Sequence, residues 1–143
     1  MKERNYESEC IALEQLECAL NMYFEKKYFA AVTLAGSAEE ILGKLAKHQK
    51  KENSIDALKK AACQIHKRLY GEEINVKHIA DRTNYARNKL KHVNPGVEPM
   101  VTINAEEEAV VMLSRAIDNY WLVKEQLSPL MEKFEREQRF VSN

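Results

Sequence analysis

Residues 29–42 read FAAVTLAGSAEEIL, and this stretch predicts a helix that packs closely against a neighbour. Apolar side chains recur every three or four residues, which is typical of an amphipathic helix, and the pattern extends over about residues 28–50. Four small residues, 35–38, lie at its centre. A glycine inside a helix costs about 1 kcal/mol relative to alanine, so we expect close approach by another helix at Gly36.

Helical periodicity continues on both sides of this stretch. A helix is expected before it, over about residues 6–26. Two more are expected after it, one from Ser54 as N-cap to Gly71 and one over about residues 76–92. Residues 94–96, Asn-Pro-Gly, should end the latter, because proline disfavours helical conformation in the residue before it.

Two further helices are expected toward the C-terminus. Asn104, with Glu107 three residues later, is typical of a capping box. The core face of that helix would be formed by Val110, Leu113, Ile117, Tyr120 and Trp121. Ser128 and Pro129 favour the start of a last helix, which would pack through Leu130, Met131, Phe134 and Phe140. No stretch alternates with period two, so the sequence predicts one all-α domain over residues 1–143, an antiparallel bundle of about five to six helices.

Charge is unevenly distributed along the chain, although the net charge is zero. From Lys44 to His92 there are thirteen Lys and Arg against five Asp and Glu, and the rest of the chain has nine against seventeen. Two interpretations stay open. The excess belongs either to ordinary solvated helix faces or to a basic surface that attracts phosphate groups.

Several classes of site lack their motifs in this sequence. The glycines fit neither dinucleotide nor P-loop spacing, and H-E-x-x-H and G-x-S-x-G are absent. The adjacent Glu39 and Glu40 have no accompanying E-x-x-H, so a di-iron site is not expected. No cofactor and no metal are therefore expected.

The cysteines and the hydropathy pattern predict where the protein resides. Cys10, Cys18 and Cys63 are odd in number and form no C-x-x-C pair, which favours a reducing cytoplasm. The N-terminal residues are charged, and no apolar run approaches the ~18–20 residues that crossing a bilayer requires. We expect a soluble cytoplasmic protein with no membrane partner.

Residues 87–92 read RNKLKH, with an arginine five positions before a histidine and a polar residue directly after the arginine. This hexapeptide resembles the motif that defines the HEPN family of helical ribonucleases. Residues 29–42 are similar to the second helix of that family. Residues 111–120, VMLSRAIDNY, are similar to the helix that follows its motif loop. The resemblance spans about residues 28–121, in the order of the family.

The resemblance implies a HEPN-like fold and metal-independent cleavage of RNA, in which the ribose 2′-hydroxyl attacks its own phosphodiester. Histidine readily exchanges a proton near neutral pH, so His92 would be the general base or acid. Arg87 would hold the phosphate and stabilise charge in the transition state, and Asn88 would orient His92 or the phosphate. Basic side chains that would contact the RNA backbone are Lys89, Lys91 and Arg82.

Partners are also implied by the resemblance. Family members form symmetric homodimers in which two motifs face one cleft, and many are toxins of toxin–antitoxin or antiphage systems. An antitoxin such as a nucleotidyltransferase-like protein would then be a partner beside RNA.

Two alternatives stay open. One is a non-catalytic HEPN-like module that binds a partner protein, a nucleotide or RNA. The other is a helical bundle in which Arg87 and His92 are incidental cations near a helix C-terminus, where the helix dipole favours them. Residues five apart on an ideal helix lie about 140° apart, so the spacing alone leaves a shared cleft undecided.

Overall fold

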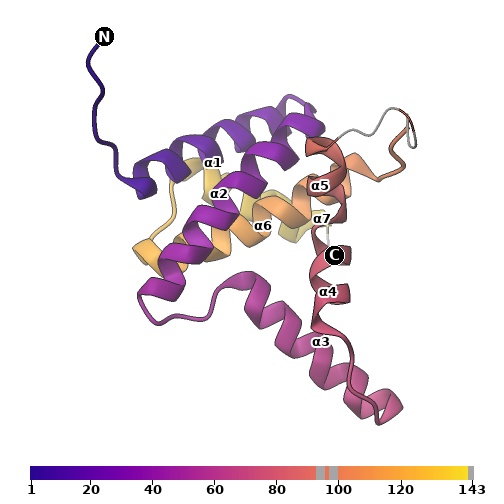
Figure 1. Ribbon diagram of the computed structural model, residues 1–143. Coiled ribbons are helices and arrows are strands. Elements are labelled where there is room, and N and C mark those ends of the chain that lie inside the picture. The colour runs from indigo at the N-terminus through magenta and orange to yellow at the C-terminus, as the bar shows by residue number, and fades with distance from the viewer. Residues whose placement is uncertain (93–95, 97–99, 142–143) are drawn as a thin grey trace.

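The computed structural model describes residues 1–92, 96 and 100–141, and this part of the chain is all-helical (Figure 1). The expected all-α fold is confirmed for the described residues, which form seven helices rather than five or six. Their bounds are α1 Ser8–Phe24, α2 Tyr28–His48, α3 Ser54–Tyr70, α4 Val76–Thr83, α5 Tyr85–Lys91, α6 Ala105–Lys124 and α7 Pro129–Val141. No described helix is long and apolar enough to cross a membrane.

Helix α2 lies at the centre of the molecule because apolar side chains surround most of its circumference. It makes its most extensive contacts with α6 and α1, and α7 packs against α1. The largest fully buried side chains come from these four helices and are Leu16, Leu20, Val32, Leu42, Met112, Leu113, Ile117, Asn119, Met131 and Phe134. The predicted core face of the 105–124 helix is thus largely correct. Trp121 is an exception, because 51% of it is exposed.

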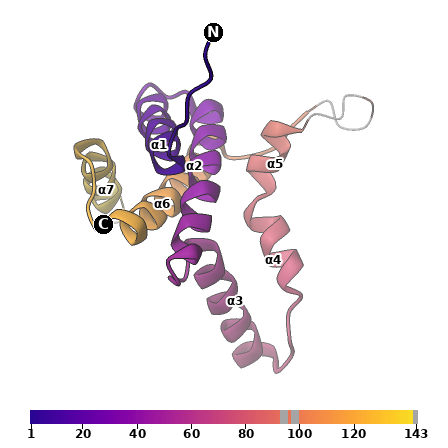
Figure 2. The same ribbon diagram turned by 60° about the vertical axis from the view of Figure 1, so that its left-hand side comes forward.

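Helices α3 and α4 project from this four-helix body as an arm (Figure 2). Neither contains a buried residue, although both have apolar positions at helical spacing. Asn53, not the predicted Ser54, is the N-cap of α3, and its side-chain oxygen accepts from the backbone N–H of Asp56 at 3.0 Å. Gly71 ends α3 in the left-handed conformation at φ 70°, as a C-terminal glycine commonly does.

The helix expected over residues 76–92 is divided at Asn84 into α4 and α5. The sequence did not indicate this break, because asparagine is tolerated inside helices and the cause is a tertiary contact. Arg115 of α6 donates two hydrogen bonds to the Asn84 side-chain oxygen, each at 3.2 Å. The predicted stop at 94–95 lies outside the described residues.

The two C-terminal helices begin where the sequence predicts. Asn104 accepts from the backbone N–H of Glu107 at 3.2 Å, and the Ser128 hydroxyl accepts from that of Met131 at 3.4 Å. Phe134 is buried, and its ring packs edge-on against Tyr23 with centroids 5.2 Å apart. Phe140 was expected to pack as well, but it is exposed because it lies in the last turn, beyond the body.

Candidate functional site

The short helix α5 brings the predicted catalytic residues into one pocket. Arg87, Asn88 and His92 line a cavity of about 290 Å³ between α5, α1 and α2. We call it the Arg87 pocket, and its described lining is Gln15, Thr33, Leu34, Gly36, Ser37, Glu40, Arg87, Asn88, Lys91 and His92. The helix ends at Lys91, and His92 has extended backbone at φ −124° and ψ 101°. Arg87 and His92 therefore line the same cavity, although residues five apart on an ideal helix lie about 140° apart.

The small-residue patch of α2 accommodates the side chain of Arg87. A Cβ atom placed on Gly36 would stand 2.6 Å from Cδ of Arg87 and 2.9 Å from Cγ. These separations are too short for a real contact. The close approach expected at Gly36 is therefore made by one arginine side chain from α5, and glycine leaves the space through which that side chain passes.

Arg87 extends across α2 toward a buried carboxylate. Its Nη1 lies 3.6 Å from Oε2 of Glu39, and the Glu39 side chain is only 4% exposed. Nη2 of Arg115 donates to the other Glu39 oxygen, Oε1, at 2.8 Å. Two guanidinium groups from different helices thus share one carboxylate. A buried charge is tolerated when it is paired and hydrogen-bonded in this way.

Two asparagines join this buried pair to the start of the arm. Asn119, fully buried, donates to the backbone oxygen of Glu39 at 3.1 Å and accepts from the backbone N–H of Ser54 at 2.7 Å. Asn53 donates to the backbone oxygen of Gly43 at 3.2 Å. Through these two side chains, hydrogen bonds link α2 to α6 and to the start of α3.

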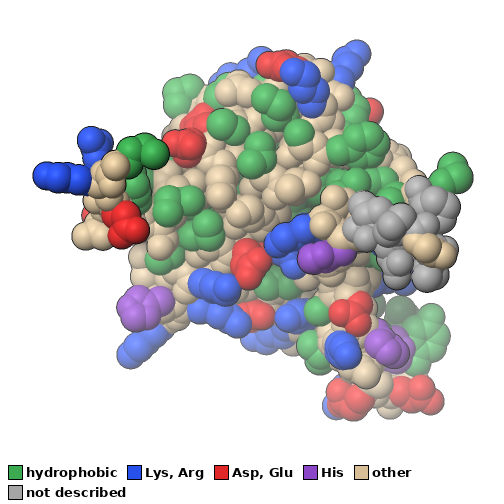
Figure 3. Space-filling view, turned by 45° about the horizontal axis from the view of Figure 1, so that its top comes forward, with side chains coloured by type: hydrophobic (Ala, Val, Ile, Leu, Met, Phe, Trp, Pro, Cys, Tyr) green, Lys and Arg blue, Asp and Glu red, His purple; other side chains and the backbone are tan. Residues whose placement is uncertain are grey.

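A second, more basic cavity of about 250 Å³ adjoins the Arg87 pocket and shares Glu40 and Arg87 with it. Its lining includes Lys44, Lys47 and Arg115. A hydrogen bond from the Lys44 ammonium, 2.9 Å from the Glu40 carboxylate, holds the pKa of Glu40 below its ordinary value. Lys and Arg side chains gather in a band on this face, with acidic side chains among them (Figure 3).

The predicted RNA-contacting residues divide into two groups. Lys91 lines the Arg87 pocket. Lys89 and Arg82 are not among the described residues that line it: Lys89 places its ammonium 5.7 Å from the centre of the Tyr85 ring, and Arg82 is exposed on α4.

Sequence reasoning did not connect Gln15 or Glu40 with the pocket. Gln15 comes from α1, 72 positions before Arg87, and nothing in the local pattern links the two. Its side-chain oxygen is buried and has no hydrogen-bond partner in the described part of the chain. Glu40 was part of the quoted stretch, but its place between two cavities depends on how α5 crosses α2.

Comparison with known proteins adds no family. No family model, curated protein or solved structure matches this chain. Within the described residues, no group of three or more His, Cys, Asp or Glu side chains is placed to hold a metal ion.

Proposed function

We propose that this chain is a metal-independent RNA endonuclease of HEPN type whose site is the Arg87 pocket. One observation carries the proposal: Arg87, Asn88 and His92, which the sequence motif singles out, line the same cavity. Lys91 adds a further cation to its wall. A role as the toxin of a toxin–antitoxin or antiphage pair, with an antitoxin such as a nucleotidyltransferase-like protein, belongs to the same proposal.

The chemistry needs a proton acceptor, a phosphate ligand and an in-line leaving group. The ribose 2′-oxygen attacks the adjacent phosphorus while its proton passes to the imidazole of His92. The bond from phosphorus to the 5′-oxygen breaks, which leaves a cyclic phosphate and a 5′-hydroxyl. Arg87 has five N–H donors, so its single 3.6 Å contact with Glu39 leaves other donors for the phosphate oxygens.

Other groups in the pocket have roles consistent with this reaction. Asn88 lies one helical turn before His92 and would orient its ring or the phosphate. A ligand hydroxyl or amino group would give the unpaired oxygen of Gln15 a hydrogen-bond partner. The leaving 5′-oxygen needs a proton, which a second copy facing this pocket would supply from its own histidine.

The decisive experiment is cleavage of a mixed RNA pool in EDTA by the wild type and by His92→Ala. We expect cleavage by the wild type and a loss of about 10²–10⁴-fold in the variant, which is the usual contribution of a general acid or base. His78→Ala is the matched control, since His78 is an exposed histidine on α4 and does not line the Arg87 pocket. Undiminished cleavage by His92→Ala would refute the assignment.

A non-catalytic binding module is the second candidate, and one observation favours it. Arg87 already has a carboxylate partner in Glu39, and the pocket of one chain holds one histidine. A pure preparation that binds RNA in a fluorescence anisotropy titration but never cuts it would support this alternative. In either case RNA affinity should fall as salt rises, because binding releases counterions from the phosphates.

A further inference from the structure

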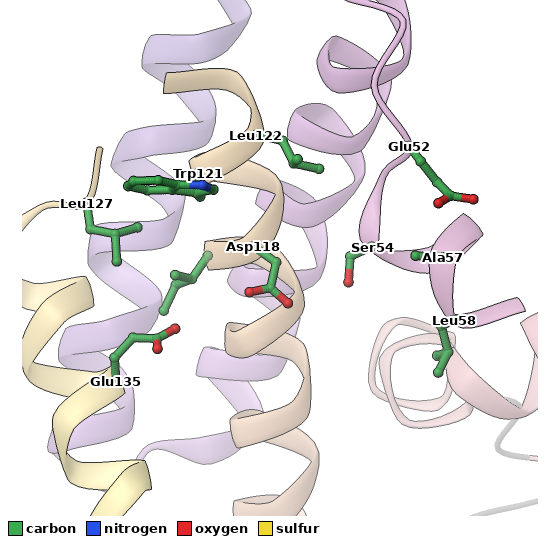
Figure 4. Close-up of a pocket in the computed structure, with 10 residues that line it drawn as sticks. Glu52, Ser54, Ala57, Leu58, Asp118, Trp121, Leu122, Leu127 and Glu135 are labelled. Carbon is green, nitrogen blue, oxygen red and sulfur yellow. The ribbon is translucent and has the colours of Figure 1, made fainter. Parts of the chain in front are cut away.

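A large groove lies on another part of the molecule, between the start of α3 and the α6–α7 corner (Figure 4). Its volume is about 590 Å³. We call it the Trp121 groove, and it is lined by Glu52, Ser54, Ala57, Leu58, Ile117, Asp118, Trp121, Leu122, Leu127 and Glu135. In Figure 4 the side chains of α6 and α7 lie on one side, and Ala57 and Leu58 of α3 lie on the other. None of these residues lines the Arg87 pocket.

The Trp121 groove combines exposed apolar surface with negative charge that is largely without counter-ions among the described residues. Its described lining contains three carboxylates and neither Lys nor Arg. Glu52 lies 3.9 Å from Lys60, whereas Asp118 and Glu135 have no ion-pair partner among the described residues. Burial, and then the nearby charge of Glu135, raise the pKa of Asp118. This surface is suited to an apolar partner that carries positive charge.

An apolar stripe on α3 continues outward from the groove. It consists of Leu58, Ala61, Ile65 and Leu69, whose spacings of three and four residues place them on one helix face. All four are exposed, Ile65 to 58% and Leu69 to 69%. The outer half of α3 leaves the body and lies beside α4 (Figure 2). A different helix face from the stripe carries the partly covered residues Ile55, Lys59, Ala62 and His66. Contiguous exposed apolar residues of this kind mark interaction sites.

The free end of α3 has the charge that the groove lacks. Arg68 lies in its last turn and is exposed, whereas Lys67 beside it already pairs with Glu73 at 3.1 Å. Arg68 is three residues after Ile65, so it borders the stripe. The chain thus presents both halves of a self-complementary surface: the acidic groove beside the first turns of α3 and, about 20 Å away along that helix, its basic apolar end.

We propose that the stripe of α3 and the Trp121 groove form the interface between two copies of this chain. The two α3 helices run antiparallel about a two-fold axis, so Leu69 of each copy lies beside Leu58 of the other. Arg68 of each copy then faces Asp118 and Glu135 of its partner. Ala61 lies near the axis, where its small side chain permits close helix contact. Such a self-complementary contact is the commonest kind between identical chains. This contact is distinct from the one at the Arg87 pocket that would bring in a second histidine, and the proposal does not depend on the nuclease function.

The test is a charge exchange followed by analytical ultracentrifugation. Samples should run from about 1 to about 100 µM, because interfaces of modest size have micromolar dissociation constants. Four forms are compared: wild type, Arg68→Asp, Asp118→Arg and the double variant. Lys77→Glu is the matched control, since it reverses a charge on exposed α4 outside the interface. Arg68 and Lys77 are exposed, and Asp118 lies in the wall of an open groove, so the fold should tolerate the changes.

We expect each single variant to reduce the mass of the wild-type oligomer about two-fold at concentrations where the wild type is assembled. The double variant should restore it, because the exchanged charges again face opposite signs across the interface. A wild type that stays at the 16.6 kDa monomer mass throughout the range would overturn the proposal. An oligomer that both single variants leave unchanged would overturn it equally.

Discussion

The side chain of Arg87 crosses α2 directly over Gly36, where an added Cβ would stand 2.6 Å from Cδ of the arginine. This relationship joins the two parts of the sequence that stand out most, the small-residue patch and the RNKLKH hexapeptide. It also explains why a helix that is otherwise rich in good helix formers retains a glycine at its centre. The same crossing brings the guanidinium to 3.6 Å from buried Glu39.

Replacing Gly36 by alanine should displace Arg87 and leave the fold largely intact. The added methyl raises helix propensity by about 1 kcal/mol, which offsets part of the cost of moving the arginine. We expect the melting temperature to change little. RNA cleavage should fall by up to about 100-fold, because a misplacement of about 1 Å in a reacting group has that effect. The Nε–Hε cross-peak of Arg87 in an NMR spectrum reports the displacement directly.

Gly43→Ala is the matched comparison for that variant, because it adds the same methyl to the same helix away from Arg87. Its Cβ would stand 3.2 Å from the side-chain nitrogens of Asn119 and Asn53. The Arg87 cross-peak should stay in place in Gly43→Ala. If it moves as far as in Gly36→Ala, the direct contact is not the cause.

Two substitutions distinguish Asn53, the N-cap of α3, from the neighbouring Ser54. Asn53→Ala removes the acceptor for the Asp56 N–H and the donor to the Gly43 oxygen, and Asn53 is only 5% exposed. We expect its free energy of unfolding in urea to fall by about 1–2 kcal/mol. Ser54→Ala should change it by less than about 0.5 kcal/mol. A larger loss in the serine variant would show that Ser54 is the cap after all.

The ion pair of Glu40 and Lys44 makes a pH-dependent contribution to the stability of the fold. Because the folded pKa of Glu40 is lowered, this contribution is complete above the ordinary glutamate pKa and is lost as pH falls through the lowered value. Lys44→Met should raise the pKa of Glu40 in an NMR titration of its carboxyl carbon. The difference in stability from the wild type should be at most about 0.5 kcal/mol at neutral pH and should vanish in acid. A stability difference that persists below the lowered pKa of Glu40 would show that it does not arise from the ion pair.

The sequence predicts the helices well where local rules decide them. Periodic apolar positions locate α1, α2 and α6, and short-range hydrogen bonds at Asn104 and Ser128 begin α6 and α7 as expected. Periodicity does not distinguish a face that packs from one that stays exposed. Ile65 has the same spacing as a core residue, yet no second layer covers it within one chain.

The candidate site was predictable only as far as its residues lie close together in sequence. Arg87, Asn88 and His92 fall within one hexapeptide, whereas Glu39 and Arg115 are 76 positions apart. Their pairing depends on how α2 and α6 pack, and neither residue carries a local signal for it. Gln15 reaches the Arg87 pocket from α1 for the same kind of reason.

Asn84 contacts Arg115 of the buried Glu39–Arg115 ion pair and also precedes α5, which carries Arg87. Replacing Asn84 should therefore affect both the ion pair and the Arg87 pocket. Its side-chain oxygen accepts two hydrogen bonds from Arg115, and the helix is interrupted at this residue, between α4 and α5. In Asn84→Ala the Arg115 guanidinium loses this acceptor, so we expect a loss of about 1–3 kcal/mol in urea unfolding. Alanine also favours one continuous helix, which would turn Arg87 and His92 away from α2, so RNA cleavage should fall more than stability does.

Asn75→Ala is the control for this variant. Asn75 caps α4 through the Lys77 N–H at 2.9 Å, and its loss costs about 1 kcal/mol without touching Arg115. If the two variants lose cleavage only in proportion to their stability, Asn84 does not hold α5 in register with the pocket.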